Sequence, residues 1–253
     1  MMQLLVYEND EFLAYDYSPG CTPGIIFLTG FRSDMMGDKA LFIEDFCSKQ
    51  GRSFLKFDYM GHGQSSGKVD DGSIGLWTQN ALQMLDEITE GPQILVGSSM
   101  GGWIMLLLAL RRKSRISALL GLAAAPDFTE DLLWNTFSSC QKDNMEKDGK
   151  VVIPNCYDEV PYTITRHLIK DGRKYLMLRD KIALDMPVRL IHGIGDEDVP
   201  WETALKIAEL IIAQDVEVQL IKNSDHRLSD ENSLNHLAHT LDTLIQKVEK
   251  GLK

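Results

Sequence analysis

A five-residue pattern, Gly97-Ser98-Ser99-Met100-Gly101, constrains the fold of this chain more than any other feature of its sequence. A short apolar run at residues 94–96 precedes the pattern, and an almost wholly apolar segment at residues 103–110 follows it. This order predicts a strand that turns sharply into a buried helix, with Ser99 at the turn. Glycine is needed on both sides, because a Cβ there would collide with the neighbouring strand or helix. The turn would lift the Ser99 hydroxyl over a helix N-terminus, where negative charge is favoured. We therefore interpret the pattern as a nucleophile elbow, with a plain Gly/Ser turn as the alternative.

Short runs of β-forming residues alternate with helical patterns along most of the chain. The strand-like runs lie at residues 4–7, 12–17, 25–29, 54–59, 94–97, 116–122, 188–192 and 216–221. The helical patterns lie at residues 39–50, 76–88, 201–213 and 234–248. Several runs are apolar on both faces, as in strands that are covered by helices on either side of a parallel sheet. The predicted fold class is therefore α/β, with a mostly parallel, doubly wound sheet of about eight strands.

One long stretch interrupts this alternation. At about residues 127–181, more than fifty residues separate two runs that should be neighbouring strands. The stretch is charged at residues 143–150 and irregular around Pro154 and Pro161. Insertions of this length are usually lids or functional loops. The sequence therefore predicts a single domain over residues 1–253, with a lid or cap inserted at about 127–181.

An acidic loop follows the run at residues 188–192. It reads Gly193-Ile194-Gly195-Asp196-Glu197-Asp198 and lies at the predicted carboxyl edge of the sheet, where open α/β sheets bind ligands. A serine nucleophile on such a fold takes its acid, and then its base, from further along the chain. Asp196 is the candidate acid and Asp198 its alternative; otherwise the acidic residues cap the helix that begins near Trp201. A metal site formed by Asp196, Glu197 and Asp198 is disfavoured, since no His or second carboxylate cluster accompanies them.

The candidate base is His226, which lies in the loop at residues 223–228, after the next strand and before the last helix. It is downstream of both partners, as the order requires. His192 is interpreted as a strand-end residue, because no acid follows it by a strand and a loop. His236 and His239 belong to the last amphipathic helix and are expected to be solvated or packing residues.

An oxyanion hole needs two preorganised N–H donors. We expect one from Met100, directly after the candidate nucleophile, and the other from Phe31, where Gly30 permits a close approach. The glycine-rich loop at residues 57–67 resembles a phosphate-binding loop, but no Lys and no helix N-terminus follow it at the spacing that such a loop requires. This loop, with His62, is interpreted as a structural turn that supports the elbow.

Composition and charge exclude several classes of protein. The formal net charge of −11 argues against a nucleic-acid surface, which would need a basic stripe. The longest apolar stretch, residues 103–110, is far shorter than the roughly 20 residues that span a bilayer, so no membrane span is expected. The N-terminus lacks the pattern of a signal peptide, and the cysteines lack the C-x-x-C spacing of a zinc site or a disulfide framework. We expect a cytoplasmic protein, or one of the mitochondrial matrix if a transit peptide was removed. The four cysteines are Cys21, Cys47, Cys140 and Cys156.

Four separated segments carry a family resemblance. Residues 57–59, 91–103, 199–201 and 224–227 resemble the group of animal mitochondrial α/β-hydrolases that act as acyl-protein thioesterases and acyl-glucuronide esterases. The chain is similar to the α/β-hydrolase superfamily over essentially its whole length. The resemblance implies an α/β-hydrolase fold, with Ser99, Asp196 and His226 as the nucleophile, acid and base.

Together these features predict a serine hydrolase that needs no cofactor or metal and cleaves carboxylic esters or thioesters through an acyl-enzyme. Its substrate would be a small-molecule or acylated-protein ester or thioester, and the protein would be a monomer or homo-oligomer. Leu132, Trp134 and Phe137 of the insertion either line the acyl pocket or pack the lid onto the core. Two alternatives remain: a C–C or peptide bond hydrolase with the same triad, and a catalytically silent relative that binds a small ligand.

Overall fold

An eight-stranded sheet forms the centre of the molecule. The structure, a computed structural model, describes residues 2–153 and 161–251, so Cys156 and Pro154 lie outside the described residues. The strand order is β1-β2-β4-β3-β5-β6-β9-β10, and only the pairings of β1 with β2 and of β2 with β4 are antiparallel. The strands are β1 (Gln3–Val6), β2 (Phe12–Ser18), β3 (Cys21–Leu28), β4 (Arg52–Phe57), β5 (Gln93–Ser98), β6 (Ile116–Leu122), β9 (Val188–Gly193) and β10 (Val216–Ile221). The predicted mostly parallel sheet of about eight strands is confirmed.

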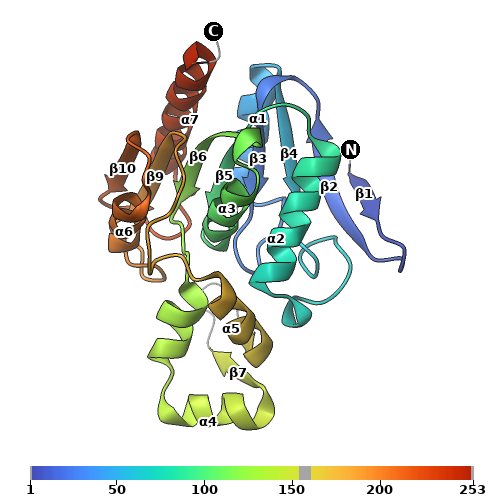
Figure 1. Cartoon of the computed structure of the whole chain (residues 1–253), viewed down its shortest axis with the longest axis vertical. Helices are drawn as coiled ribbons and strands as arrows, with labels where there is room; N and C mark the ends of the chain where they lie inside the picture. Colours follow the sequence, from blue (N-terminus) through green and yellow to red (C-terminus); the bar gives the residue numbers. More distant parts are fainter. Residues whose placement is uncertain (1, 154–160, 252–253) are drawn as a thin grey trace.

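Helices cover both faces of the sheet (Figure 1). On one face, Trp77, Trp103 and Ile207 join a single apolar cluster with the sheet; on the other, Ile43 and Leu241 do so. The helices of the first face are α2 (Ile74–Gln83), α3 (Met100–Arg111) and α6 (Glu202–Leu210), and those of the second are α1 (Asp38–Lys49) and α7 (Glu231–Gly251). The predicted helix at residues 76–88 ends earlier, because its last turn, residues 84–88, widens into a π-helix.

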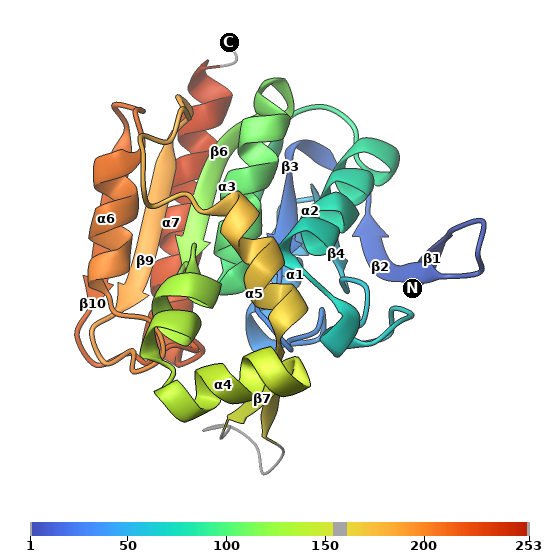
Figure 2. The same cartoon turned by 60° about the horizontal axis from the view of Figure 1, so that its bottom comes forward.

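The inserted segment (residues 127–181) follows β6 and precedes β9 in the chain. It forms a second, smaller body at one end of the sheet (Figures 1 and 2). It has its own apolar cluster, formed by Phe137, Met145, Val151, Ile164 and Ile169. Its short pair of strands was not expected from the sequence, which indicated only an irregular stretch around Pro154 and Pro161. Its elements are η4 (Thr129–Leu133), η5 (Trp134–Thr136), α4 (Ser139–Asp148), β7 (Lys150–Ile153), β8 (Tyr162–Thr165), α5 (Arg166–Gly172) and η6 (Arg173–Tyr175).

A buried carboxylate joins the two ends of the inserted segment. Asp127 is fully buried and accepts hydrogen bonds from the backbone N–H groups of Met177 (2.7 Å) and Leu178 (2.8 Å). Its Oδ2 also lies 3.3 Å from Nη1 of Arg179. The chain therefore enters and leaves the inserted segment at one fixed point beside the sheet.

Candidate active site

The turn between β5 and α3 has the geometry of a nucleophile elbow. Ser99 adopts φ 54° and ψ −121°, a conformation that residues with a side chain rarely occupy. A Cβ on Gly97 would lie 2.5 Å from the Gly101 carbonyl oxygen, and one on Gly101 would lie 2.0 Å from that of Leu28. Both glycines are therefore required by close backbone approaches, as the sequence predicts. The Ser99 N–H donates to the Leu122 carbonyl of the neighbouring strand (3.0 Å), which holds the turn against the sheet.

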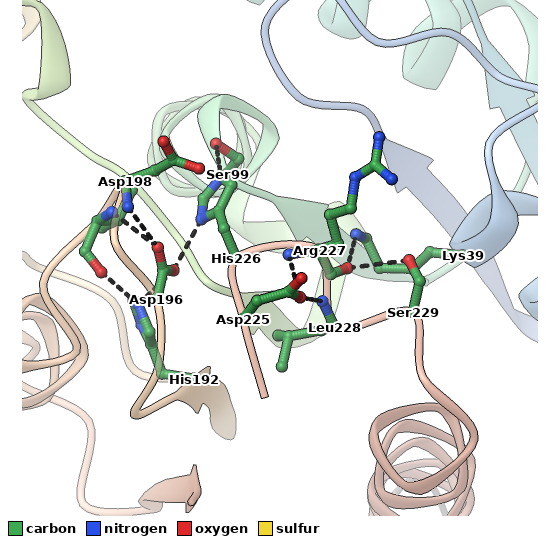
Figure 3. Close-up of polar contacts among 11 residues, drawn as sticks. Lys39, Ser99, His192, Asp196, Asp198, Asp225, His226, Arg227, Leu228 and Ser229 are labelled. Atoms are coloured by element: carbon green, nitrogen blue, oxygen red, sulfur yellow. Dashed lines mark hydrogen bonds and ion pairs between the residues drawn. The ribbon is translucent and has the colours of Figure 1, made fainter. Parts of the chain in front are cut away.

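The three candidate catalytic side chains meet at the carboxyl end of the strands (Figure 3). The Nε2 atom of His226 lies 2.9 Å from the Ser99 hydroxyl oxygen, and its Nδ1 atom lies 2.7 Å from Oδ2 of Asp196. This geometry requires that Nδ1 carry the proton and Nε2 accept from the serine hydroxyl. The result is one continuous hydrogen-bonded line from serine to imidazole to carboxylate.

The Asp196 carboxylate is held on both oxygens. Its Oδ1 accepts from the backbone N–H groups of Asp198 (2.9 Å) and Val199 (2.8 Å), whereas Oδ2 faces Nε2 of His192 (3.1 Å) as well as His226. Burial alone raises the pKa of the Asp196 carboxyl, but the hydrogen bonds from His192 and His226 outweigh burial and hold the pKa well below its usual range. Asp196 is therefore ionised at neutral pH and orients the imidazole.

Asp198 was the alternative acid, and it contacts Asp196 through its backbone N–H. One ligand atom each from Asp196, Asp198 and His226 lies within 4.8 Å of the others, which is close enough to bind a metal ion. However, Oδ2 of Asp196 already accepts from two imidazoles. The arrangement suits a proton relay better than a set of metal ligands.

The loop that carries His226 is anchored from two sides. Oδ1 of Asp225 accepts from the backbone N–H groups of Arg227 (3.0 Å) and Leu228 (3.3 Å), and the Lys39 ammonium of α1 donates to the Arg227 carbonyl (Figure 3). Burial lowers the pKa of Lys39 to about 8, against the raising effect of Asp225. These contacts fix the position of the imidazole.

The two predicted oxyanion donors belong to segments that pack beside Ser99. Met100 is the first residue of α3, so its N–H has no acceptor within the helix. Phe31 lies in the loop after β3, and a Cβ on the preceding Gly30 would be only 3.4 Å from the Ser99 Cβ. In the described part of the chain, no hydrogen bond occupies the Phe31 N–H.

The glycine-rich loop at residues 57–67 supports the loop after β3, and not the elbow itself as the sequence suggested. The Nε2 atom of His62 accepts from the Arg32 backbone N–H (3.0 Å), and Oδ1 of Asp58 accepts from that of Met35 (2.7 Å). Burial lowers the pKa of His62 to about 4, so its ring is neutral and Nε2 is free to accept. Sequence reasoning gave His62 a structural role but could not identify the amide that it holds.

A cavity of about 800 Å³ lies over Ser99 and His226. Its lining combines apolar residues, most of them from the inserted segment, with charged and hydroxyl side chains. The apolar residues include Phe128, Leu132, Leu133, Ile153, Tyr162 and Ile164; the charged and hydroxyl residues include Ser33, Asp38, Lys39, Asp198, Arg227 and Ser229.

Of the three predicted pocket residues, only Leu132 lines this cavity. Phe137 is 7% exposed and packs inside the apolar cluster of the inserted segment. The Trp134 ring lies under the Arg173 guanidinium (4.7 Å) and near the Lys142 ammonium (5.6 Å). Trp134 and Phe137 are therefore absent from the cavity lining, and they pack within the inserted segment and not between it and the sheet.

Arg32 is a residue that the sequence analysis missed. Its Nη2 atom donates to Asp70 (2.6 Å) and to the Thr163 carbonyl of β8 (3.2 Å), and its guanidinium lies 5.7 Å from the Tyr162 ring centre. It ties the hairpin of the inserted segment to the loop that carries Phe31. An isolated Arg gives no sequence signal for a contact across more than a hundred residues.

Comparisons with known proteins show the family to which this fold belongs. The profile of the alpha/beta hydrolase fold family matches residues 25–151. The chain belongs to the α/β-hydrolase family. It is 42% identical to the rat protein named palmitoyl-protein thioesterase ABHD10, mitochondrial, over 93% of this chain and 80% of the relative. The human protein of that name is 39% identical over 93% of this chain and 77% of its own length. The structure of mouse alpha/beta hydrolase domain-containing protein 10 is 38% identical, with a TM-score of 0.92 over 98% of this chain and 99% of the other.

These findings confirm the predicted fold and the prediction of an ester or thioester hydrolase. The relatives' names contain the word mitochondrial, so they give no support to the cytoplasmic location predicted from the sequence. Within residues 2–153 and 161–251, no helix combines the length and apolar character that a bilayer crossing needs.

Proposed function

We propose that this chain hydrolyses thioesters and esters through an acyl-enzyme on Ser99, with His226 as the general base and Asp196 as the acid that orients it. The observation that carries the proposal is the hydrogen-bonded line from Ser99 Oγ to His226 (2.9 Å) and from His226 to Asp196 (2.7 Å). The line ends at the cavity, where a substrate carbonyl can reach the hydroxyl.

Each residue has a defined part in the reaction. His226 takes the proton from Ser99 as the serine oxygen attacks the acyl carbon, and Asp196 stabilises the imidazolium that forms. The N–H groups of Met100 and Phe31 donate to the oxyanion of the tetrahedral intermediate. His226 then protonates the leaving thiol or alcohol. It next activates a water molecule, which releases the acid and regenerates the serine.

We propose a long-chain acyl group as the part of the substrate that enters the cavity. Apolar side chains from Phe128, Leu132, Leu133 and Ile164 offer an alkyl chain a surface removed from water. The relatives named palmitoyl-protein thioesterase support an acylated protein as substrate, and the same names support a mitochondrial location. The inserted segment is proposed as the lid over this acyl site.

Two other functions fit this site less well. A C–C or peptide bond hydrolase could use the same triad, but the thioesterase names of the relatives favour the thioester. A silent ligand-binding relative is disfavoured because all three triad members are present and within hydrogen-bond distance.

The test is fluorophosphonate labelling combined with hydrolysis of acyl thioesters and esters of graded chain length. Wild-type protein should be labelled and should prefer long acyl chains, whereas Ser99→Ala should be unlabelled and lose several orders of magnitude in rate. Ser98→Ala, one residue away, is the matched control and should stay active. Labelling or turnover that survives Ser99→Ala would falsify the nucleophile assignment.

A further inference from the structure

A second histidine contacts the carboxylate of the proposed triad. His192, at the end of β9, is completely buried. Its Nε2 atom lies 3.1 Å from Oδ2 of Asp196 and 3.0 Å from the carbonyl oxygen of Val199. Both neighbours are acceptors, so Nε2 carries the proton and donates to them. This fixes the tautomer of a ring that the reaction steps above do not use.

The other ring nitrogen of His192 argues against a role in packing alone. In the described part of the chain, Nδ1 is buried and has no hydrogen-bond partner. A buried acceptor without a partner destabilises a fold, and an apolar side chain in the same place would avoid that loss. The position therefore carries a histidine at a cost to stability. A costly residue of this kind that also contacts the triad carboxylate is consistent with a functional role.

The acceptor of this hydrogen bond is the catalytically important oxygen. Oδ2 of Asp196 accepts from His226 at 2.7 Å and from His192 at 3.1 Å, whereas Oδ1 is taken by two backbone N–H groups. A donor on Oδ2 draws negative charge away from the bond to His226. His192 therefore acts on both the direction and the strength of the Asp196–His226 interaction.

We propose that His192 is a positioning residue that orients the Asp196 carboxylate and weakens its hold on the His226 imidazolium. This inference rests on the proposed triad. Without the His192 donor, the Asp196 charge concentrates on His226 and favours its protonated form. His226 would then become protonated, and stop acting as a base, at a higher pH. The less restrained carboxylate would also orient the imidazole less well.

Other charged groups surround the same pair and form a constant background. Glu197 and Asp198 belong to the acid loop, Asp225 and Arg227 flank the base, and Lys39 approaches from α1. Among the described residues, no hydrogen bond or ion pair links His192 to any of these five. Substitutions at residue 192 therefore change the contacts with Asp196 and with the Val199 carbonyl and leave these charges in place.

The test compares the pH profiles of His192→Leu and His192→Gln. The leucine variant lacks the donor, whereas the glutamine amide can reach the place of Nε2 and donate to Asp196. We expect His192→Leu to lose about tenfold in kcat, the effect of one hydrogen bond to a charged group, with KM unchanged. Its acid limb should move up by about half a pH unit or more. His192→Gln should return both quantities toward wild-type values.

A lower kcat with an unmoved acid limb, or a glutamine variant no better than leucine, would assign His192 a structural role only and overturn the inference. If His192→Leu does not fold, His192→Asn serves in its place, because its shorter amide leaves Oδ2 without the donor. Activity in Ser99→Ala would instead overturn the triad itself, so the two failures are distinguishable.

Discussion

Ser99 holds a strained backbone conformation because several neighbours fix it. Its N–H and C=O are both bonded, to Leu122 and to the N–H of Ala125 (3.0 Å), and glycines on either side allow the close approach. Strain of this kind is retained where the surrounding structure determines the conformation. It leaves the hydroxyl 2.9 Å from His226 without any adjustment of the backbone.

At the same scale, the two aspartates of the acid loop should differ sharply in importance. Asp196→Asn should lower kcat on the order of 10⁴-fold, because an amide neither fixes the His226 tautomer nor stabilises the imidazolium. Asp198→Asn should cost little, since the contact of Asp198 with Asp196 runs through its backbone N–H. Steady-state hydrolysis of one thioester by both variants checks the ranking. The reverse order would move the acid to Asp198.

The pH dependence of the rate should follow one ionisation. The Asp196 pKa lies well below its usual range, so this carboxylate stays charged at the pH values at which the rate is measured. The acid limb therefore belongs to the imidazole of His226, the proposed base. Activity should fall as pH drops through that limb, because a protonated ring cannot accept the Ser99 proton. A kcat/KM profile from pH 4.5 to 9 measures it, and two ionisations on the acid side would contradict this assignment.

The sequence could predict Ser99, Asp196 and His226 as candidates because chain order and loop position restrict each to one or two residues, and the structure brings these three within hydrogen-bond distance. The sequence could not predict the contact of His192 with Asp196, because that contact depends on how β9 packs in the sheet. Trp134 illustrates the same limit. An apolar residue in an insertion can face a cavity or a cation, and here the Trp134 ring packs against the Arg173 guanidinium. Packing partners, unlike chain order, are not encoded locally.

At the scale of elements, the inserted segment shows where hydrophobic periodicity no longer predicts secondary structure. The hairpin of β7 and β8 has four residues in each strand, too few for alternation to be distinguished from a loop. What fixes the segment is a small number of anchors at its base and rim, chiefly Asp127 and Arg32. Contacts of this kind should contribute more to the free energy of unfolding than the exposed ion pairs nearby.

Asp127→Asn tests the anchor at the base. Asparagine tolerates the positive φ of 62° at this position, but it offers one acceptor oxygen where two backbone N–H groups now bind a carboxylate. We expect a loss of about 2 kcal/mol in unfolding free energy, from a buried donor left without its partner. Faster amide exchange at residues 177–179 should accompany it.

Asp131→Asn is the matched control for this prediction. Asp131 pairs with the same Arg179, but both side chains are more than 30% exposed, so the pair should contribute less than about 1 kcal/mol. Equal losses in urea unfolding of the two variants would show that the buried carboxylate is not the anchor.

At the scale of the whole molecule, alternation of strands and helices was enough to predict the sheet, because such elements bury their apolar faces by packing helices against a mostly parallel sheet. The order of the strands came only from the structure: β3 lies between β4 and β5, and the chain crosses back over the sheet to achieve it. The same crossing brings the loops after β3 and β4 together. His62 in one loop thereby comes to hold the Arg32 amide in the other.

Stability of the whole fold toward acid should depend on His62. Its ring is 2% exposed, and burial lowers its pKa to about 4, below the ordinary value near 6.5. The unfolded chain therefore takes up this proton first, so stability is complete above pH 6.5 and is lost as pH falls toward 4. His62→Gln keeps an acceptor for the Arg32 N–H but does not titrate. Between pH 7 and pH 5, urea unfolding should show wild type losing about 2 kcal/mol more than this variant.

Asp58 and Asp127, whose pKa values burial raises, act in the opposite direction but equally in both proteins. His236→Gln, at an exposed position of α7, should behave as wild type. If wild type and His62→Gln lose the same stability, His62 is not a neutral buried ring, and its hydrogen bond to the Arg32 amide must be reassigned.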